Sequence, residues 1–243
     1  MNRDVLGGII LFSYYLVVCV IVPVPLKYWT RVPPEIIRKV QHIGYSLSVF
    51  LLLNLFSTWY WALSASAVLV VVAYPTLALI ERTRWYRRAF ADRAQSGGEF
   101  RRSLLMVQAT FGLLIVVLWG LMGIRWAPVV GVAVTGWGFG DAAAALVGKA
   151  WGRRRVLLRW VDHAKTYEGT AAMAAFAAAA FFLTLFFYVG LPWASSLAIA
   201  VIVAPICAIV ELVTRGGYDT FTVPIVAALA IAPLVGLFSA AGH

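Results

Sequence analysis

Eight long apolar runs dominate the pattern of hydrophobic and polar positions along this chain. They cover residues 6–26, 38–57, 60–80, 104–122, 127–147, 168–189, 193–213 and 220–240. Because about 20 apolar residues in a helix cross the hydrocarbon core of a bilayer, each run predicts a membrane-spanning helix. The run at 38–57 gives the weakest signal, since Arg38, Lys39 and His42 fall in its first turns, so a count of seven spans is the alternative.

The composition of the 243 residues agrees with this pattern. Hydrophobic residues make up 63% of the chain and charged residues 12%, with a mean hydropathy of +0.89. An ordinary soluble domain has about 25% charged residues. We therefore expect an all-α integral membrane protein, a polytopic bundle of about eight transmembrane helices that forms one domain over residues 1–243. Cys19 and Cys207 lie in apolar runs and are interpreted as packed core residues, not as a disulfide or a metal pair.

The basic residues give an expected orientation. All of them except Arg3 and Arg125 lie in the loops 27–39, 81–103, 148–167 and 214–219, which alternate with loops that hold almost none. The positive-inside rule places the basic loops in the cytoplasm and both termini outside. It also explains the net charge of +10 without nucleic acid as a partner. No transit peptide is visible, so a bacterial inner membrane is the expected location.

The acidic residues concentrate at the cytoplasmic ends of the predicted spans. Asp141 lies in the last turns of the fifth span, Glu168 begins the sixth, Glu211 ends the seventh and Asp219 begins the eighth. Carboxylates are costly in hydrocarbon, so those that a membrane protein keeps are usually functional. A polar site at this face can meet a soluble nucleotide while its membrane side meets lipid.

Two glycine-containing segments carry part of this chemistry. The first runs from Gly140-Asp141 to Gly148-Lys149, and its small residues allow close approach of a helix or a phosphate. It is not a P-loop, because Ala150 follows Lys149. A packed helix would explain the small residues, but an intramembrane carboxylate needs a cation, a metal or another partner.

The second segment is Lys165-Thr166-Tyr167-Glu168-Gly169-Thr170. Lys165 offers a positive charge to a phosphate. Thr166 could equally be a helix N-cap, and Glu168 a first-turn acid that compensates the helix dipole.

Two further segments complete the candidate site. Glu211 and Asp219 flank the tight turn that Gly216-Gly217 predicts, and with Asp141 they could share a divalent cation. Asp219 by itself would also suit an N-cap. Near the start of the chain, Arg38 and His42 share a helix face beside Lys39, where contact with a phosphate or with lipid headgroups is expected.

Together these segments resemble the CTP-dependent lipid-alcohol kinase family, which includes phytol kinase, dolichol kinase and the CTP-using diacylglycerol kinases. The family pattern E-x-x-R-K-x-x-H corresponds to Glu35–His42, and G-D-x-x-A-x-x-x-G-[KR]-x-x-G to Gly140–Gly152. The later K-[ST]-x-E-G-[ST] corresponds to Lys165–Thr170, and a late Glu with D-N-x-x-[VI]-P to Glu211 and Asp219–Pro224. The resemblance covers about residues 34–230. It departs from the family at Thr220, where the family usually has Asn.

The resemblance implies transfer of the γ-phosphoryl group of CTP to a lipid alcohol, with Mg²⁺ as the cofactor. It implies catalytic roles for Asp141, Glu168, Lys165 and Asp219, and metal ligation by Asp141 with Glu211 or Asp219. The residues expected at the nucleotide are Arg38, Lys39, His42, Gly140, Gly148, Lys149, Lys165, Thr166, Gly169 and Thr170. Glu168 is the first choice for orienting the attacking hydroxyl and Asp219 the second.

Two other functions remain open from the sequence. Phosphatidate cytidylyltransferases share the middle motifs, but their late H-G-G-x-x-D-R-x-D run does not occur here. A lipid or ion transporter would also keep carboxylates in the membrane, although transporter sites typically lie near the midplane. The relatively short chain favours a phytol, geranylgeraniol or other polyprenol kinase over a dolichol kinase.

Overall fold

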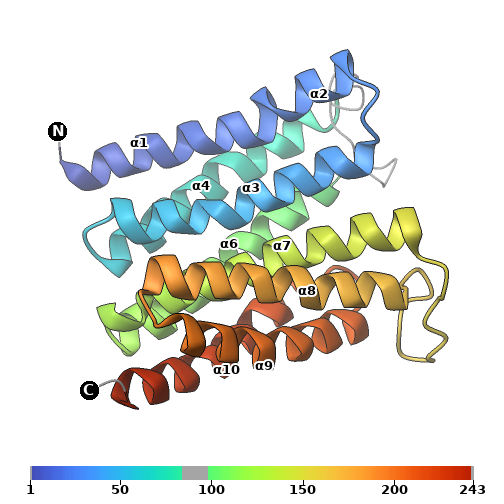
Figure 1. The fold of residues 1–243 in the computed structure, drawn as a ribbon. Coiled ribbons are helices and arrows are strands. Elements are labelled where there is room, and N and C mark those ends of the chain that lie inside the picture. The colour runs from blue at the N-terminus through green and yellow to red at the C-terminus, as the bar shows by residue number, and fades with distance from the viewer. Residues whose placement is uncertain (1, 84–97, 242–243) are drawn as a thin grey trace. The chain divides into compact units, whose positions relative to one another are not determined.

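The computed structural model describes residues 2–83 and 98–241, and its described elements are helices (Figure 1). The predicted all-α class is confirmed. The chain divides into two compact units, residues 1–116 and 117–243, which are described in turn. The expectation of one domain over the whole chain stays a prediction.

The described residues of the first unit form a long helical segment followed by three more helices. α1 (Arg3–Leu16) continues through a wide π-helical stretch (Val17–Ile21) into α2 (Pro23–Trp29). Pro23 has no N–H to donate to the preceding turn, which accounts for the irregular stretch before it. α3 (Pro34–Leu55), α4 (Trp59–Ile80) and α6 (Glu99–Leu114) follow.

Polar contacts hold α3 antiparallel to α1 along its length. At one end the Arg3 guanidinium donates to the carbonyls of Asn54 and Leu55, at 2.9 and 3.2 Å. Towards the other end, the amide of Gln41 donates to the Cys19 carbonyl at 3.2 Å. α3, which runs alongside α1, can therefore contain polar residues, because these residues find hydrogen-bond partners within the unit.

The second unit is built around one buried helix. α7 (Ala127–Trp151) packs against α8 (Tyr167–Thr184), α9 (Trp193–Val213) and α10 (Asp219–Ala241). A π-helical stretch (Ile115–Leu121) and a short 3₁₀ turn (Ile124–Trp126) precede α7, and a second π-helical stretch (Leu185–Val189) extends α8. Almost every residue of α7 from Ala127 to Ala143 is buried. This burial makes α7 the central element of the unit.

Glycines on α7 allow α8 to approach it closely. A Cβ at Gly136 would overlap the ring of Phe181, and one at Gly140 would lie 2.5 Å from the Met173 sulfur. Both glycines and both α8 side chains are buried. Small residues where two helices cross are typical of membrane proteins, because close packing is a main source of attraction there.

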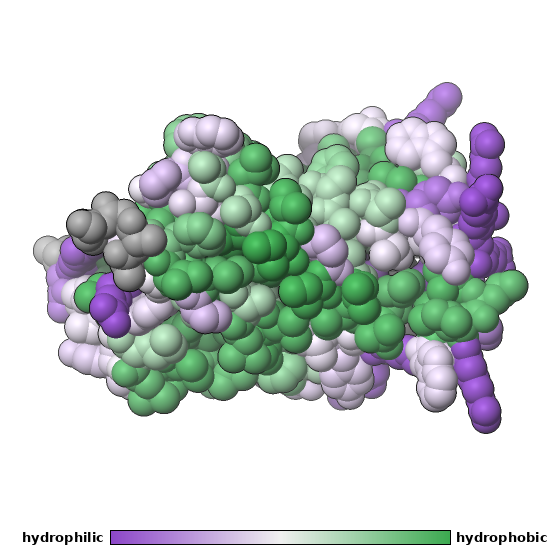
Figure 2. Space-filling model, turned by 60° about the horizontal axis from the view of Figure 1, so that its bottom comes forward, coloured by the Kyte–Doolittle hydropathy of each residue, from purple (hydrophilic) through white to green (hydrophobic). Residues whose placement is uncertain are grey.

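Seven helical segments in the described part of the chain are long and apolar enough to cross a membrane. They are Arg3–Trp29, Trp59–Ile80, Arg101–Leu121, Ile124–Trp151, Tyr167–Val189, Trp193–Val213 and Asp219–Ser239. Figure 2 shows an extended hydrophobic face of the kind that lipid would contact. The remaining long helix, α3, corresponds to the predicted run that gave the weakest signal. The prediction of a multi-pass membrane protein is confirmed, and seven of the eight predicted spans are long and apolar enough to cross a membrane.

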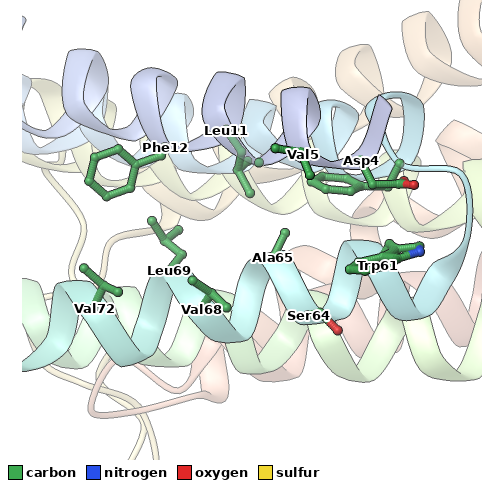
Figure 3. Close-up of a pocket in the computed structure, with 12 residues that line it drawn as sticks. Asp4, Val5, Leu11, Phe12, Trp61, Ser64, Ala65, Val68, Leu69 and Val72 are labelled. Carbon is green, nitrogen blue, oxygen red and sulfur yellow. The ribbon is translucent and has the colours of Figure 1, made fainter. Parts of the chain in front are cut away.

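An apolar groove of about 390 Å³ lies between α1 and α4 in the first unit (Figure 3). Leu11 and Phe12 of α1 face Val68, Leu69 and Val72 of α4 across it. Its polar end is formed by Asp4, whose carboxylate accepts hydrogen bonds from the N–H and hydroxyl of Ser57 at 2.8 and 2.9 Å. Asp4 thus ties the start of α1 to the α3–α4 turn.

The tight contact between α7 and α8 gives the first prediction. Gly136→Ala forces a methyl group into the Phe181 ring, and overpacking of this kind costs about 1–3 kcal/mol. We expect a lower midpoint of thermal unfolding in detergent. Gly8→Ala is the matched control, since nothing lies within 4 Å of its new Cβ. Equal midpoints for the two variants would contradict this account of the contact.

Candidate functional site

Three helices of the second unit bring three carboxylates together. Asp141 of α7, Glu211 of α9 and Asp219 of α10 each offer one oxygen, and these oxygens lie within 4.8 Å of one another. Asp141 and Glu211 are buried and Asp219 is partly buried. The candidate ligand set predicted from the sequence therefore lies in one place, which we call the carboxylate cluster.

Two residues of the cluster lie at helix ends, whereas the third lies within a helix. Glu211 is in the last turn of α9 and Asp219 is the first residue of α10, but α7 continues for ten residues beyond Asp141. At 1.5 Å per residue, α7 therefore extends about 15 Å past the cluster. The predicted fifth span ended at 147, so the helix is longer than the apolar run suggested.

A tight turn sets the spacing between Glu211 and Asp219. Gly216 and Gly217 have φ values of +67° and +80°, in the left-handed region that favours glycine. The hydroxyls of Thr214 and Thr222 lie 3.1 Å apart and join the end of α9 to the first turn of α10. The chain thus reverses direction within a few residues, which keeps the two carboxylates at the same level.

Lys165 reaches the cluster from the loop before α8. Its Nζ lies 2.9 Å from Oε1 of Glu211 and donates to the carbonyls of Thr214, at 3.1 Å, and of Glu211 itself. A lysine ammonium has three N–H donors, and these three acceptors engage all of them. In this structure Lys165 therefore caps the C-terminal end of α9 and holds the Glu211 carboxylate.

The loop that presents Lys165 is folded back on itself. The Val156 N–H donates to the Lys165 carbonyl and the Tyr167 N–H to the Arg154 carbonyl, both at 3.0 Å. The hydroxyl of Thr166 accepts from the Gly169 N–H at 3.1 Å, so Thr166 is the N-cap of α8. Thr170 donates its hydroxyl to the Thr166 carbonyl. These contacts fix the position from which Lys165 extends.

Glu168 lies outside the carboxylate cluster. Its two carboxylate oxygens both accept from the Arg154 N–H at 3.3 Å. The bond ties the first turn of α8 to the loop. The structure thus separates Glu168, the first choice for orienting a hydroxyl, from Asp219, the second choice, which is in the cluster.

The glycines expected at the nucleotide lie where α7 and α8 cross. A Cβ at Gly169 would be 2.9 Å from the Ala144 carbonyl oxygen and 3.3 Å from the Cα of Gly148. Gly152 ends α7, and its N–H donates to the Gly148 carbonyl at 3.1 Å. With Gly140 against Met173, the motif glycines allow backbone-to-backbone packing. Lys149, from the same motif, is exposed on the last turn of α7.

The basic residues near the start of the chain belong to the first unit. Arg38, Lys39 and His42 lie in the first turns of α3, where Arg38 forms an ion pair with Glu35 at 3.4 Å. Lys39 is buried and His42 is partly buried. Their approach to a nucleotide stays a prediction.

Two residues of the site had no role in the sequence analysis. Arg215 donates from Nη2 to the carbonyls of Arg159, at 2.5 Å, and Val161, at 3.3 Å, and so joins the α9–α10 turn to the loop before α8. Thr214 joins the two helix ends, as described. Their only signal in the sequence was their place between Glu211 and Asp219. Thr220, the departure from the family pattern, is buried, and its N–H donates to Asp219 Oδ1 at 3.1 Å.

The donor set fits a hard divalent cation. Carboxylate oxygens are the ligands that Mg²⁺ prefers, usually one or two of them together with water and substrate phosphates. Carboxylates this close repel one another, and Lys165 offsets part of that repulsion. A small shift of the three side chains would let their oxygens reach one ion.

The phytol kinase of Synechocystis sp. (strain ATCC 27184 / PCC 6803 / Kazusa) is similar to this chain. The two are 31% identical over 202 residues, which make up 81% of this chain and 78% of that protein. No family model and no solved structure matches the chain. The similarity therefore rests on most of the length of both sequences.

The cluster predicts which carboxylate matters for metal binding. Asp141→Asn should weaken Mn²⁺ binding by at least about tenfold, since the loss of even a supporting group costs a site about 10- to 100-fold. Electron paramagnetic resonance of free Mn²⁺, with purified protein in detergent, measures this affinity. Glu168→Gln is the matched control and should bind as the wild type does. If Glu168→Gln weakened Mn²⁺ binding and Asp141→Asn did not, the ion would instead bind at Glu168.

Proposed function

This chain belongs to the lipid-alcohol kinase family that includes phytol kinase, and from that premise we propose that it transfers the γ-phosphoryl group of CTP to the hydroxyl of a membrane-dissolved lipid alcohol. The observation that carries the proposal is the carboxylate cluster of Asp141, Glu211 and Asp219. Phosphoryl transfer depends mainly on positioning and on neutralising charge, which is what such a cluster supplies through a metal ion.

In this proposal Asp141, Glu211 and Asp219 hold Mg²⁺. When bound, the ion would neutralise negative charge on the nucleotide phosphates. The protein contributes by fixing its oxygen donors before the nucleotide arrives, through the buried position of Asp141 on α7 and the glycine turn between α9 and α10. Lys165 keeps Glu211 in place.

The attacking group is the hydroxyl of the lipid alcohol. Its oxygen forms a bond to the γ-phosphorus while the bond from that phosphorus to the bridging oxygen of CDP breaks. The hydroxyl proton passes to a carboxylate, and the products are CDP and a lipid monophosphate. We assign this role to the second carboxylate oxygen of Asp219, because its first oxygen is the one that faces the metal ligands of the cluster, whereas Glu168 bonds to the Arg154 N–H. Glu168 then supports the loop that carries Lys165.

The remaining basic residues contact the phosphates in this proposal. Lys149 lies in the last turn of α7, and Arg38, Lys39 and His42 lie in the first turns of α3. Thr166 and Thr170 contribute through the α8 N-terminus, which favours negative charge. Gly140, Gly148 and Gly169 act indirectly by setting the distance between α7 and α8. Lys165 is a positioning residue, since its three donors already have acceptors on α9.

The substrate we propose is phytol, geranylgeraniol or another polyprenol, entering sideways from the bilayer. The alternation of basic and non-basic loops supports an active site at the cytoplasmic face of a bacterial inner membrane, with both termini outside. This arrangement lets the soluble nucleotide and the membrane-bound alcohol reach the site from different phases.

A transfer assay tests the proposal. The purified protein, Mg²⁺ and γ-labelled CTP are incubated with phytol, geranylgeraniol, a polyprenol, diacylglycerol or phosphatidate. We expect label on a polyprenol-type alcohol, and Asp141→Asn should lower the rate by about two to three orders of magnitude, as loss of one charge-stabilising group does. Pyrophosphate released only with phosphatidate would instead identify a cytidylyltransferase. With neither product, the transporter hypothesis would replace the kinase.

The two lysines should affect different kinetic constants. Lys149→Met removes a phosphate contact and should raise KM for CTP. Lys165→Met releases Glu211 and should lower kcat with little change in KM, because it disturbs the cluster and not nucleotide binding. Steady-state kinetics at saturating Mg²⁺ distinguish the two. If Lys165→Met mainly raised KM for CTP, Lys165 would be a phosphate ligand after all.

A further inference from the structure

The loop between α7 and α8 exposes large apolar side chains. Residues 151–160, Trp-Gly-Arg-Arg-Arg-Val-Leu-Leu-Arg-Trp, form what we call the basic-apolar loop. Its exposed apolar residues are Trp151 (69% exposed), Leu157 (80%), Leu158 (48%) and Trp160 (72%). Neither the carboxylate cluster nor helix packing accounts for these side chains.

The same loop is strongly basic. Arg153, Arg154, Arg155 and Arg159 are all exposed, and no acidic residue occurs among residues 151–160. The nearest acidic groups along the chain are Asp162, whose carboxylate accepts from the Ala164 N–H, and Glu168, which accepts from the Arg154 N–H. Arginines and bulky apolar residues therefore occur together in one short segment.

Contacts at its base hold the loop in one shape. Val156 and Val161 are fully buried beneath it, and Arg215 donates to the carbonyls of Arg159 and Val161. The hydrogen bonds between residues 154–156 and 165–167 close its base. The exposed side chains thus belong to a defined surface, which keeps Val156 and the adjoining Val161 inside and turns tryptophan, leucine and arginine outward.

The position of the loop indicates what covers this surface. The segment Ile124–Trp151 before it and the segment Tyr167–Val189 after it are both long and apolar enough to cross a membrane. A loop that joins two such spans is expected to begin and end near the level of the lipid headgroups. Tryptophan is enriched at that level, leucine reaches the acyl boundary, and arginine extends its charge to the headgroups. Arginine also pairs with phosphate through two parallel hydrogen bonds.

We propose that the basic-apolar loop lies in the headgroup layer of the membrane and binds anionic phospholipids. The arginines match the negative headgroups, and the four apolar side chains match the adjoining acyl region. A soluble nucleotide would match the arginines alone and would leave Trp151, Leu157, Leu158 and Trp160 in water. This binding surface is separate from the carboxylate cluster, and its test needs no catalytic activity.

A fluorescent label tests the depth of the loop. Cys19 and Cys207 are buried, so an NBD dye attaches selectively to Leu157→Cys in the full chain. The protein is placed in nanodiscs of phosphatidylcholine, with or without phosphatidylglycerol, and an NBD–cysteine conjugate in buffer gives the reference for water. We expect blue-shifted emission that headgroup-labelled nitroxide lipids quench. Emission at the water value, unquenched by either lipid, would overturn the proposal.

The arginines test the preference for anionic lipid. Nitroxide-labelled phosphatidylglycerol should quench the dye roughly twofold or more above labelled phosphatidylcholine, as expected for several basic residues near anionic lipid. Changing Arg153, Arg155 and Arg159 together to Gln should remove this difference while the thermal midpoint stays the same. A difference that survives the triple change would contradict the role of the arginines. Emission that responds to added CTP but not to lipid would assign the loop to nucleotide.

Discussion

Carboxylates held together inside a membrane bundle repel one another, and the second unit is organised around that cost. Asp141 is buried on the central helix α7, and Glu211 and Asp219 meet it from the adjoining ends of α9 and α10. Burial in a low dielectric strengthens both the repulsion and any attraction to a cation. The cluster therefore has a strong demand for positive charge, which Lys165 satisfies in part and a divalent ion would satisfy further.

The packing around the cluster follows from the same requirement. Three oxygens can serve one ion only if the backbones that carry them are held in place. Gly148 and Gly169 allow α7 and α8 to touch through their backbones, while Gly216 and Gly217 turn the chain sharply between α9 and α10. The loop before α8 then carries Lys165 to the end of α9. In this arrangement the glycines position the helix backbones, and Lys165 positions the Glu211 carboxylate.

The first unit meets the cost of polar groups in a membrane by pairing them internally. Tyr15, Ser48, Gln108 and Ser66 form a buried hydrogen-bonded chain that joins α1, α3, α6 and α4. Such networks favour one packing arrangement when each member has a partner. They also explain how α3, which is not among the seven apolar segments, runs beside the strongly apolar segment Arg3–Trp29.

The sequence predicted the helices well because hydrophobic length is a direct signal of a membrane span. The runs at 193–213 and 60–80 match α9 and α4 within a residue, whereas α7 exceeds its run because Gly148–Trp151 is helical without being apolar. The carboxylate cluster was predictable since an acid at a helix end in a membrane is itself informative. The contacts of Lys165, Arg215 and Glu168 could not be predicted, because the sequence shows that a residue is charged but not which group it pairs with. The role of the motif glycines was ambiguous for a similar reason, since a glycine allows either a phosphate or another helix to approach the backbone closely.

We expect Asp141, Glu211 and Asp219 together to hold the divalent ion of the site. A structure determined with Mn²⁺ and CDP, using the anomalous signal of manganese, tests it most directly. We expect an anomalous peak among these three side chains, with oxygens at about 2.0–2.2 Å, near the distances of an octahedral Mg²⁺ site. Bound CDP with manganese held by other residues, or with no manganese at the cluster, would contradict it.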